Sequence, residues 1–247
     1  MRIIISPAKK MNVDDDSLEF VDLPVFLKES NYLKEWMQEL SFEEAKALWG
    51  CNEKLAEKNY NNLMNMNLET RLTPAILAYE GIQYQYMAPS VFENKMFSYV
   101  QNNLRILSGF YGVLKPMDGV VPYRLEMQAK TNIDGVKGLY NFWGSRLYEE
   151  VIDDTHIIVN LASKEYSKCI EKYLKPEDHY VTCVFGEISN GKVVQKGTYA
   201  KMARGEMVRF MAENNISELE DIKEFNRLGY KYSVEQSTDV QYVFVKE

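Results

Sequence analysis

Lysine and arginine side chains stand at two places in this sequence where their spacing suits the binding of an anion. Lys9 follows a short apolar segment through the turn at residues 6–8, and the carboxyl end of a strand is a common place for ligand contacts. Lys201 and Arg204 are three residues apart and share one face of a predicted helix. Glycine inside a helix costs roughly 1 kcal/mol relative to alanine, so Gly205 indicates that another backbone or a ligand comes close. A solvated turn and a solvated basic helix face are the alternatives.

Arg124 and Glu126 are two residues apart in a segment that follows Pro122. On an extended backbone, residues at this spacing point to the same side. One side chain can then bind a ligand while the other accepts a proton, or the two can form a structural ion pair. The sequence leaves both interpretations open. Glu165 is a second candidate for a general acid or base.

A predicted strand-to-helix junction carries Asn160 and Ser163. Ser163 is a natural N-cap, and free N–H groups at the start of a helix favour an anion. Asn160 stands in an otherwise apolar strand end, where a buried amide needs hydrogen-bonding partners or a ligand. The helix cap alone explains Ser163 but does not explain Asn160.

Two glycines, Gly109 and Gly112, stand where a helix is predicted to end, with Tyr111 between them. Paired glycines between helices let backbone amides approach a phosphate without an intervening Cβ, which is how helix-hairpin-helix modules bind DNA. Here two residues separate the glycines where such hairpins usually have one, and Pro116 shortens the second helix. Glycines that merely close a helix pair are the alternative interpretation.

Several classes of function are disfavoured by what the sequence lacks. Its 3 cysteines are far apart and form no CxxC pair, and the 2 histidines stand alone, so we expect reduced thiols and no metal site. We find no nucleophile–base pairing and no GxxxxGK[ST] or GxGxxG pattern, which argues against serine or cysteine hydrolases, common NTPases and dinucleotide enzymes. We therefore expect no cofactor.

The charge and hydropathy pattern limits the partners. A formal net charge of −7 argues against coating nucleic acid through bulk charge, although it permits a local basic site. No apolar run approaches the roughly 20 residues that a membrane span needs. The N-terminal run of three isoleucines is shorter than the roughly 7–15 apolar residues of a signal peptide. We expect a cytoplasmic protein without a membrane partner.

The elements that position these residues mix strands and helices without regular alternation, which favours an α+β fold. No repeat, low-complexity tract or linker marks a boundary, so residues 1–247 are expected to form one compact domain, a mixed sheet with flanking helices. Asn190-Gly191 is the favoured type I′ hairpin dipeptide, and Ser41 with Glu44 forms a capping box. Predicted strands cover 2–6, 157–161, 180–188, 192–195, 230–234 and 240–246. Predicted helices cover 31–63, 73–79, 93–107, 138–153, 163–174 and 199–215.

Six stretches of the chain together resemble the YaaA peroxide-stress family. They are 5–9 (ISPAK), 105–118 (RILSGFYGVLKPMD), 122–127 (PYRLEM), 139–144 (LYNFWG), 160–166 (NLASKEY) and 200–205 (AKMARG), and they follow the family order across nearly the whole chain. One departure is at 79–84, where the family often has Phe-x-Gly-Asp-Val-Tyr. Gly81 and Tyr84 remain, but Ile82 replaces the Asp, so no catalytic carboxylate is assigned there.

The resemblance implies a bacterial cytosolic protein that limits damage from iron and peroxide. It also implies a family-specific fold with a helix-hairpin-helix-like element at Gly109 and Gly112, and a positively charged cleft that binds duplex or distorted DNA. Carried onto this chain, the basic residues of the cleft are Lys9, Arg124, Lys201 and Arg204. Tyr84, Tyr111 and Tyr123 are candidates for stacking on bases.

Three functions therefore remain in view. The leading expectation is a protective DNA-binding protein. The alternative is an enzyme that acts on a nucleotide, a nucleobase or another small anion in the same cleft, with Glu126 or Glu165 as the general acid or base. The third is a surface for a partner protein, without a ligand.

Overall fold

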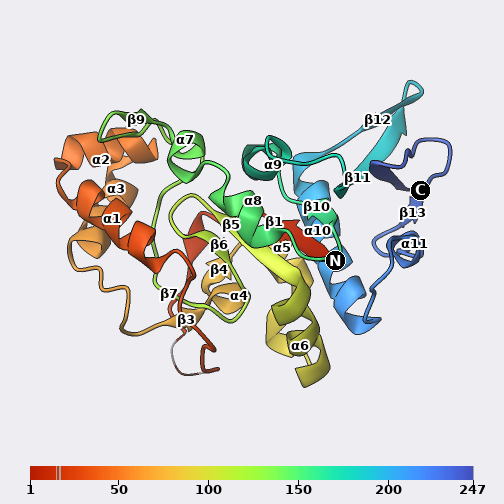
Figure 1. Cartoon of the computed structure of the whole chain (residues 1–247), viewed down its shortest axis with the longest axis horizontal. Helices are drawn as coiled ribbons and strands as arrows, with labels where there is room; N and C mark the ends of the chain where they lie inside the picture. Colours follow the sequence, from red (N-terminus) through yellow and green to blue (C-terminus); the bar gives the residue numbers. More distant parts are fainter. Residues whose placement is uncertain (15, 17, 247) are drawn as a thin grey trace.

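The centre of the molecule is a mixed β-sheet. The computed structural model describes residues 1–14, 16 and 18–246 of the chain. The strands lie in the order β13 (Tyr230–Tyr232), β14 (Gln241–Lys246), β11 (His179–Ser189), β10 (Ile157–Leu161), β1 (Arg2–Ile5), β5 (Leu104–Ser108) and β6 (Gly112–Leu114). Neighbours from β14 to β5 are parallel, whereas β13, β6 and the side strand β12 (Lys192–Val194) pair antiparallel. This mixed sheet with helices around it confirms the predicted α+β class (Figure 1).

Strand β1 occupies the middle of the sheet because its isoleucines are covered on both faces. Ile3 pairs with Val159 of β10 on one side and with Leu104 of β5 on the other, and all three isoleucines are fully buried. The chain continues from β1 to β5 on one side, and from β10 to β11 on the other. The order of strands thus reverses between β1 and β10. In open sheets of this kind, ligands bind beyond the carboxyl ends of the strands at such a reversal.

Helices group at both ends of the sheet. Helices α1 (Leu27–Gln38), α2 (Phe42–Trp49) and α3 (Glu53–Met64) lie at one end of the molecule, and α10 (Gly197–Glu213) and α11 (Leu219–Ile222) lie toward the other (Figure 1). The remaining helical segments are α4 (Ala75–Ala78), α5 (Ile82–Met87), η1 (Pro89–Val91), α6 (Asn94–Asn103), α7 (Leu139–Trp143), α8 (Arg146–Val151) and α9 (Lys164–Glu171). Short strand pairs join β2 (Lys10–Met11) to β4 (Tyr79–Glu80), β3 (Thr73–Pro74) to β7 (Gly119–Val120), and β8 (Asn132–Ile133) to β9 (Val136–Lys137). Within the described residues, the structure has no helix with the length and apolar character needed to cross a membrane.

Helix α10 packs directly on α5 because Gly205 carries no side chain. A Cβ at Gly205 would lie 2.1 Å from the carbonyl oxygen of Gln83 and 2.9 Å from the amide nitrogen of Met87. The two backbones therefore meet at a distance that only glycine permits. This confirms the expectation that another backbone approaches Gly205.

Several local predictions are confirmed. The Oγ of Ser41 accepts a hydrogen bond from the backbone N–H of Glu44, and the carboxylate of Glu44 accepts one from the backbone N–H of Ser41, so the capping box of α2 is formed. Asn190 and Gly191 have φ values of 50° and 73° in the hairpin between β11 and β12. The C-terminal hairpin and the strand at Ile157–Leu161 also form.

Two predicted helices differ from the structure. The helix predicted at 138–153 is interrupted at Gly144, and the helix predicted at 73–79 is confined to Ala75–Ala78.

The prediction of a helix-hairpin-helix-like element at Gly109 and Gly112 is wrong. Helix α6 ends at Asn103, and Leu104–Ser108 forms the fully buried strand β5, which turns back into β6 as a β-hairpin. Gly109 and Gly112 lie in this β-hairpin, where Gly112 has a φ of +73°. Short apolar runs do not distinguish a buried strand from a helix, and here β1 provides a parallel partner. Tyr111 is 1% exposed, so it is closed to a stacking base.

Candidate functional site

A cavity of about 420 Å³ opens beyond the carboxyl ends of β1 and β10, at the reversal of strand order. Its wall is formed by residues 6–10, 80–84, 123–126, 163, 165–166, 201 and 204. Segments far apart in the sequence thus meet around one hollow. Among the residues singled out from the sequence, the cavity brings together Lys9, Arg124, Glu126, Ser163, Glu165, Lys201 and Arg204. Gly109, Tyr111, Gly112 and Asn160 are not part of its wall.

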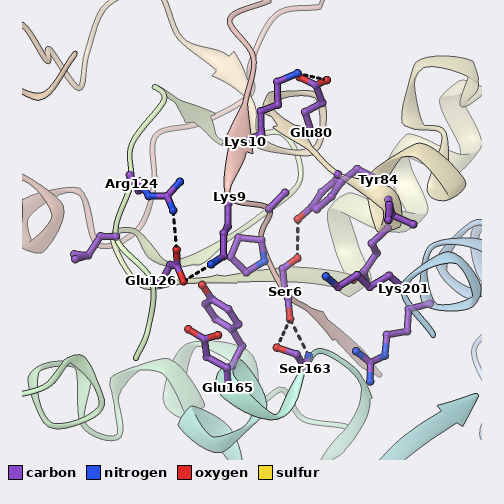
Figure 2. A pocket seen from close by; sticks show the side chains of 18 of the residues that line it. Ser6, Lys9, Lys10, Glu80, Tyr84, Arg124, Glu126, Ser163, Glu165 and Lys201 are labelled. Atoms are coloured by element: carbon purple, nitrogen blue, oxygen red, sulfur yellow. Dashed lines mark hydrogen bonds and ion pairs between the residues drawn. The ribbon is translucent and has the colours of Figure 1, made fainter. Parts of the chain in front are cut away.

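Hydrogen bonds between neighbouring strand ends hold the base of the cavity together. The Oγ of Ser6 accepts a hydrogen bond from the backbone N–H of Ser163 at 2.8 Å and lies 3.1 Å from its hydroxyl. Tyr84 donates its phenolic hydrogen to the carbonyl of Ser6 at 3.0 Å, which ties α5 to the end of β1 (Figure 2). Ser163 is the N-cap of α9 by position, but its side chain makes no capping hydrogen bond. The start of α9 therefore faces the cavity region without a side-chain cap.

One end of the cavity, which we call the paired end, consists of Lys9, Arg124 and Glu126. The Nζ of Lys9 lies 2.8 Å from one carboxylate oxygen of Glu126, and an Nη of Arg124 lies 3.4 Å from the other. Figure 2 shows Glu126 between the two cations. Of the two interpretations of Arg124 and Glu126, the structure shows the ion pair. Lys10 is paired in the same way with Glu80, at 2.6 Å.

The other end, which we call the unpaired end, consists of Lys201 and Arg204 on α10. Neither side chain forms a hydrogen bond or ion pair with any residue of 1–14, 16 or 18–246, and the Nε of Arg204 is buried without a partner. Burial lowers the pKa of Arg204, and the neighbouring Cys183 opposes that shift. In Figure 2, Ser6 stands between Lys201 and the paired end. This end of the cavity therefore presents positive charge that no carboxylate of the described residues neutralises.

Two further buried donors in the cavity wall lack a partner within the described part of the chain. They are the Nε2 of Gln83, whose residue is 7% exposed, and the Nε of Arg124. A buried donor left unsatisfied costs about 1–3 kcal/mol. Oxygen atoms of a bound anion would satisfy these donors. The arrangement is therefore suited to a ligand that carries several acceptor oxygens.

Three tyrosine rings also line the wall, those of Tyr84, Tyr123 and Tyr166. The hydroxyl of Tyr123 lies 2.7 Å from the Oγ of Ser108 and 2.8 Å from the hydroxyl of Tyr79. Burial raises the pKa of Tyr123 to about 12, so this phenol is neutral at pH 7. A hollow with cationic ends and neutral aromatic walls can hold a flat apolar group and an anion together.

Three carboxylates line the cavity beside the cations. Glu165 lines the cavity, and one of its oxygens accepts a hydrogen bond from the backbone of Gln128 at 3.2 Å. Cations outnumber carboxylates in the wall, with Lys9, Lys10, Arg124, Lys201 and Arg204 against Glu80, Glu126 and Glu165. In the described residues, no group of three His, Cys, Asp or Glu side chains is placed to hold a metal ion.

The prediction that Asn160 belongs to the binding site is wrong, because Asn160 does not line the cavity. Its residue is 3% exposed within β10, where its Nδ2 donates to the Oγ1 of Thr182 at 3.2 Å and its Oδ1 accepts from the N–H of Ala162 at 2.9 Å. The protein itself therefore satisfies the amide, and no ligand is needed to explain it. The sequence reasoning also missed Gln83, because α5 has no clear apolar periodicity that would have predicted a helix there.

Comparison with known proteins agrees with the resemblance seen in the motifs. The family model described as peroxide stress protein YaaA matches residues 1–236. A UPF0246 protein of Agathobacter rectalis is 62% identical over 247 residues, which covers 100% of this chain and 99% of that protein. A UPF0246 protein of Lachnoclostridium phytofermentans is 55% identical over 246 residues, covering 100% of this chain and 96% of that protein. The chain therefore belongs to the peroxide stress protein YaaA family.

Proposed function

We propose that the chain takes part in the peroxide stress response by binding DNA, with one phosphate-bearing nucleotide unit held in the cavity. The single observation that carries this proposal is the unpaired end, where Lys201 and Arg204 have no partner among the described residues. Guanidinium and ammonium groups bind phosphate through charge-assisted hydrogen bonds, roughly twice as strong as neutral ones. The proposed seat of the phosphate is therefore between these two side chains.

The size of the cavity supports a nucleotide unit more than a length of duplex. Its volume of about 420 Å³ is within the range of ordinary small-ligand sites. A base enters such a cavity only from a single strand, or from a duplex in which it is unpaired or extruded. Tyr123, which lines the cavity and is partly exposed, supplies aromatic surface for that base. We therefore expect distorted or single-stranded DNA to bind more tightly than intact duplex.

The overall charge supports a local contact. A formal net charge of −7 disfavours binding to DNA through bulk charge, so the proposed binding depends on the few cations that line the cavity. The proposed protective role would follow from covering exposed nucleotides. Iron would then be affected indirectly.

A DNA-binding titration tests the proposal. Labelled single-stranded, bubble and duplex DNA are titrated with the protein at low and moderate salt, and binding is followed by fluorescence anisotropy. We expect the single strand and the bubble to bind more tightly than the duplex, and we expect the double variant K201Q/R204Q to lose most of this binding. Lys192→Gln, a charge removal on strand β12 outside the cavity wall, is the matched control. Absence of binding to all three DNA forms at low salt would reject the proposal.

The second candidate is an enzyme that acts on a free nucleotide or nucleobase. The observation that favours it is the presence of Glu126 and Glu165 beside the cations, since DNA binding alone requires no carboxylates. A thermal-shift series with nucleotides and nucleosides separates the two functions. Strong stabilisation by one small molecule, with weak DNA binding, would favour the enzyme.

A further inference from the structure

A second cavity of about 340 Å³ adjoins the first at the paired end. The two cavities share Lys9, Arg124, Glu126 and Glu165 as a common wall. The rest of the second cavity is formed by residues 47–50, at the end of α2, and by residues 128–130. Helix α2 ends there at Gly50, which has a left-handed φ of 54°. The hollow at the reversal of strand order therefore has two compartments with one partition.

The wall of the second compartment contains unsatisfied donors. Trp49 is 6% exposed, and its indole N–H has no hydrogen-bond partner in the described ranges of the chain. The Nε of Arg124, which lines both compartments, also lacks a partner. Lys130 is exposed at the rim and forms no ion pair with any residue that the structure describes. These groups donate hydrogen bonds or carry positive charge, so they favour an occupant with acceptor oxygens.

Glu126 is the partition between the compartments, and its contacts allow it to move. Its carboxylate occupies the position between Lys9 and Arg124 that an anion spanning both compartments would take. The side chains of Lys9 and Glu126 are 67% and 28% exposed, and ion pairs this accessible to water contribute only about 0–1 kcal/mol. The side chain of Arg124 is only 11% exposed, so its pair with Glu126 is less solvated, and a ligand phosphate that replaces the carboxylate must contact both cations.

We infer that the second compartment binds the neighbouring phosphate-linked unit of the same ligand, so that the site reads at least two consecutive nucleotides. This inference rests on the proposed function, because it requires a nucleotide in the first compartment. One continuous ligand is favoured over two separate ones because the compartments share Lys9 and Arg124. Trp49 and Lys130 are the residues that bind only the second unit.

The test compares ligands of two lengths by isothermal titration calorimetry. The probes are thymidine 5′-monophosphate and the 5′-phosphorylated dithymidine dinucleotide. We expect the dinucleotide to bind about tenfold more tightly, the gain that one additional charge-assisted contact provides. Lys130→Gln should remove most of this gain and leave mononucleotide binding unchanged, whereas the control Lys192→Gln should change neither. Trp49→Phe keeps an aromatic side chain but removes the indole N–H, and it should reduce the gain for the dinucleotide. Because the buried side chain becomes smaller, this variant should also have a lower melting temperature, so its binding is compared at a temperature where it is fully folded.

The outcomes separate this inference from the proposed function. Mononucleotide binding without a gain for the dinucleotide would overturn the second subsite and leave the proposed function intact. An equal effect of Lys130→Gln on both ligands would also overturn it, because Lys130 would then act on the first compartment. Failure of both ligands to bind the wild-type protein would overturn the proposed function and the second subsite together.

Discussion

The two ends of the cavity are built in the same way but carry different charge. At the unpaired end, Gly205 lets α10 approach α5 so closely that a Cβ would lie 2.1 Å from the carbonyl oxygen of Gln83. At the paired end, Gly109 lets the β-hairpin approach the segment that carries Glu126, and a Cβ there would lie 2.5 Å from the carbonyl oxygen of Leu125. Each end thus depends on one glycine. Among the residues that the structure describes, a carboxylate is paired with the cations of the paired end but not with those of the unpaired end.

Because of this difference in pairing, a bound anion gains more free energy at the unpaired end than at the paired end. At the paired end, an incoming phosphate exchanges one carboxylate for another anion, so its net gain is small. At the unpaired end, burial already disfavours the charge of Arg204, and no described carboxylate offsets that cost. A phosphate bound there removes an existing penalty. A buried, unpaired arginine with a lowered pKa in a cleft is typical of functional sites.

The largest effect is expected on the stability of the protein, from a substitution where the backbones of α10 and α5 meet. Gly205→Ala should destabilise the protein by about 3 kcal/mol, because overpacking of a filled contact typically costs that much and here the obstacle is backbone. Urea denaturation measures the change in the free energy of unfolding. Gly197→Ala on the same helix is the matched control, since no atom lies within 4 Å of its Cβ position. Equal stability of the two variants would show that α10 does not depend on its close approach to α5.

The next largest effect is expected on the affinity for a mononucleotide, which should depend more on the unpaired end than on the paired end. Arg204→Gln should weaken binding of a mononucleotide by more than about tenfold, because it removes an uncompensated charge-assisted contact. Lys9→Gln should weaken it much less, because Lys9 is already paired with Glu126 at 2.8 Å. Calorimetric titration of both variants at one salt concentration measures the ratio. Equal losses would mean that the ion pair at Glu126 does not restrain Lys9.

A smaller effect in the opposite direction should come from removing the partition. Glu126→Gln should tighten binding of a mononucleotide about threefold, a gain within the roughly 0–1 kcal/mol that an exposed ion pair contributes. Glu187→Gln is the matched control, since Glu187 forms a similar exposed pair with Lys196 at 2.7 Å, outside the cavity wall. Weaker binding by the Glu126 variant would instead assign Glu126 a direct role in holding the ligand.

The sequence predicted the elements whose signals are local. The isoleucines of β1, the turn at Asn190-Gly191 and the capping box at Ser41 each carry a complete signal within a few residues, and all three form. Gly205 correctly indicated a close backbone, although the sequence did not show that the backbone is that of α5.

Other features depend on contacts between distant segments, which single-sequence reasoning cannot weigh. The run Leu104–Ser108 is apolar enough for a helix, and it becomes a strand because β1 pairs with it. Asn160 appeared to require a ligand because Thr182, its hydrogen-bond partner, lies on another strand. The ion pair of Lys9 with Glu126 joins segments more than a hundred residues apart, so the division of the cavity into two ends became visible only in the fold.

Lys201 and Arg204 are proposed to hold a phosphate together, and the salt dependence of DNA binding measures that contact. Affinity for a short single-stranded oligonucleotide is measured from low to moderate salt for the wild type and for K201Q/R204Q. Each phosphate contact that is lost lowers the slope of log K against log salt by about 0.7 for single strands. We expect K201Q/R204Q to bind more weakly and to have a slope reduced by at least that amount, and we expect Lys192→Gln to behave like the wild type. An unaltered slope in the double variant would contradict this expectation, because the phosphate would then be bound elsewhere.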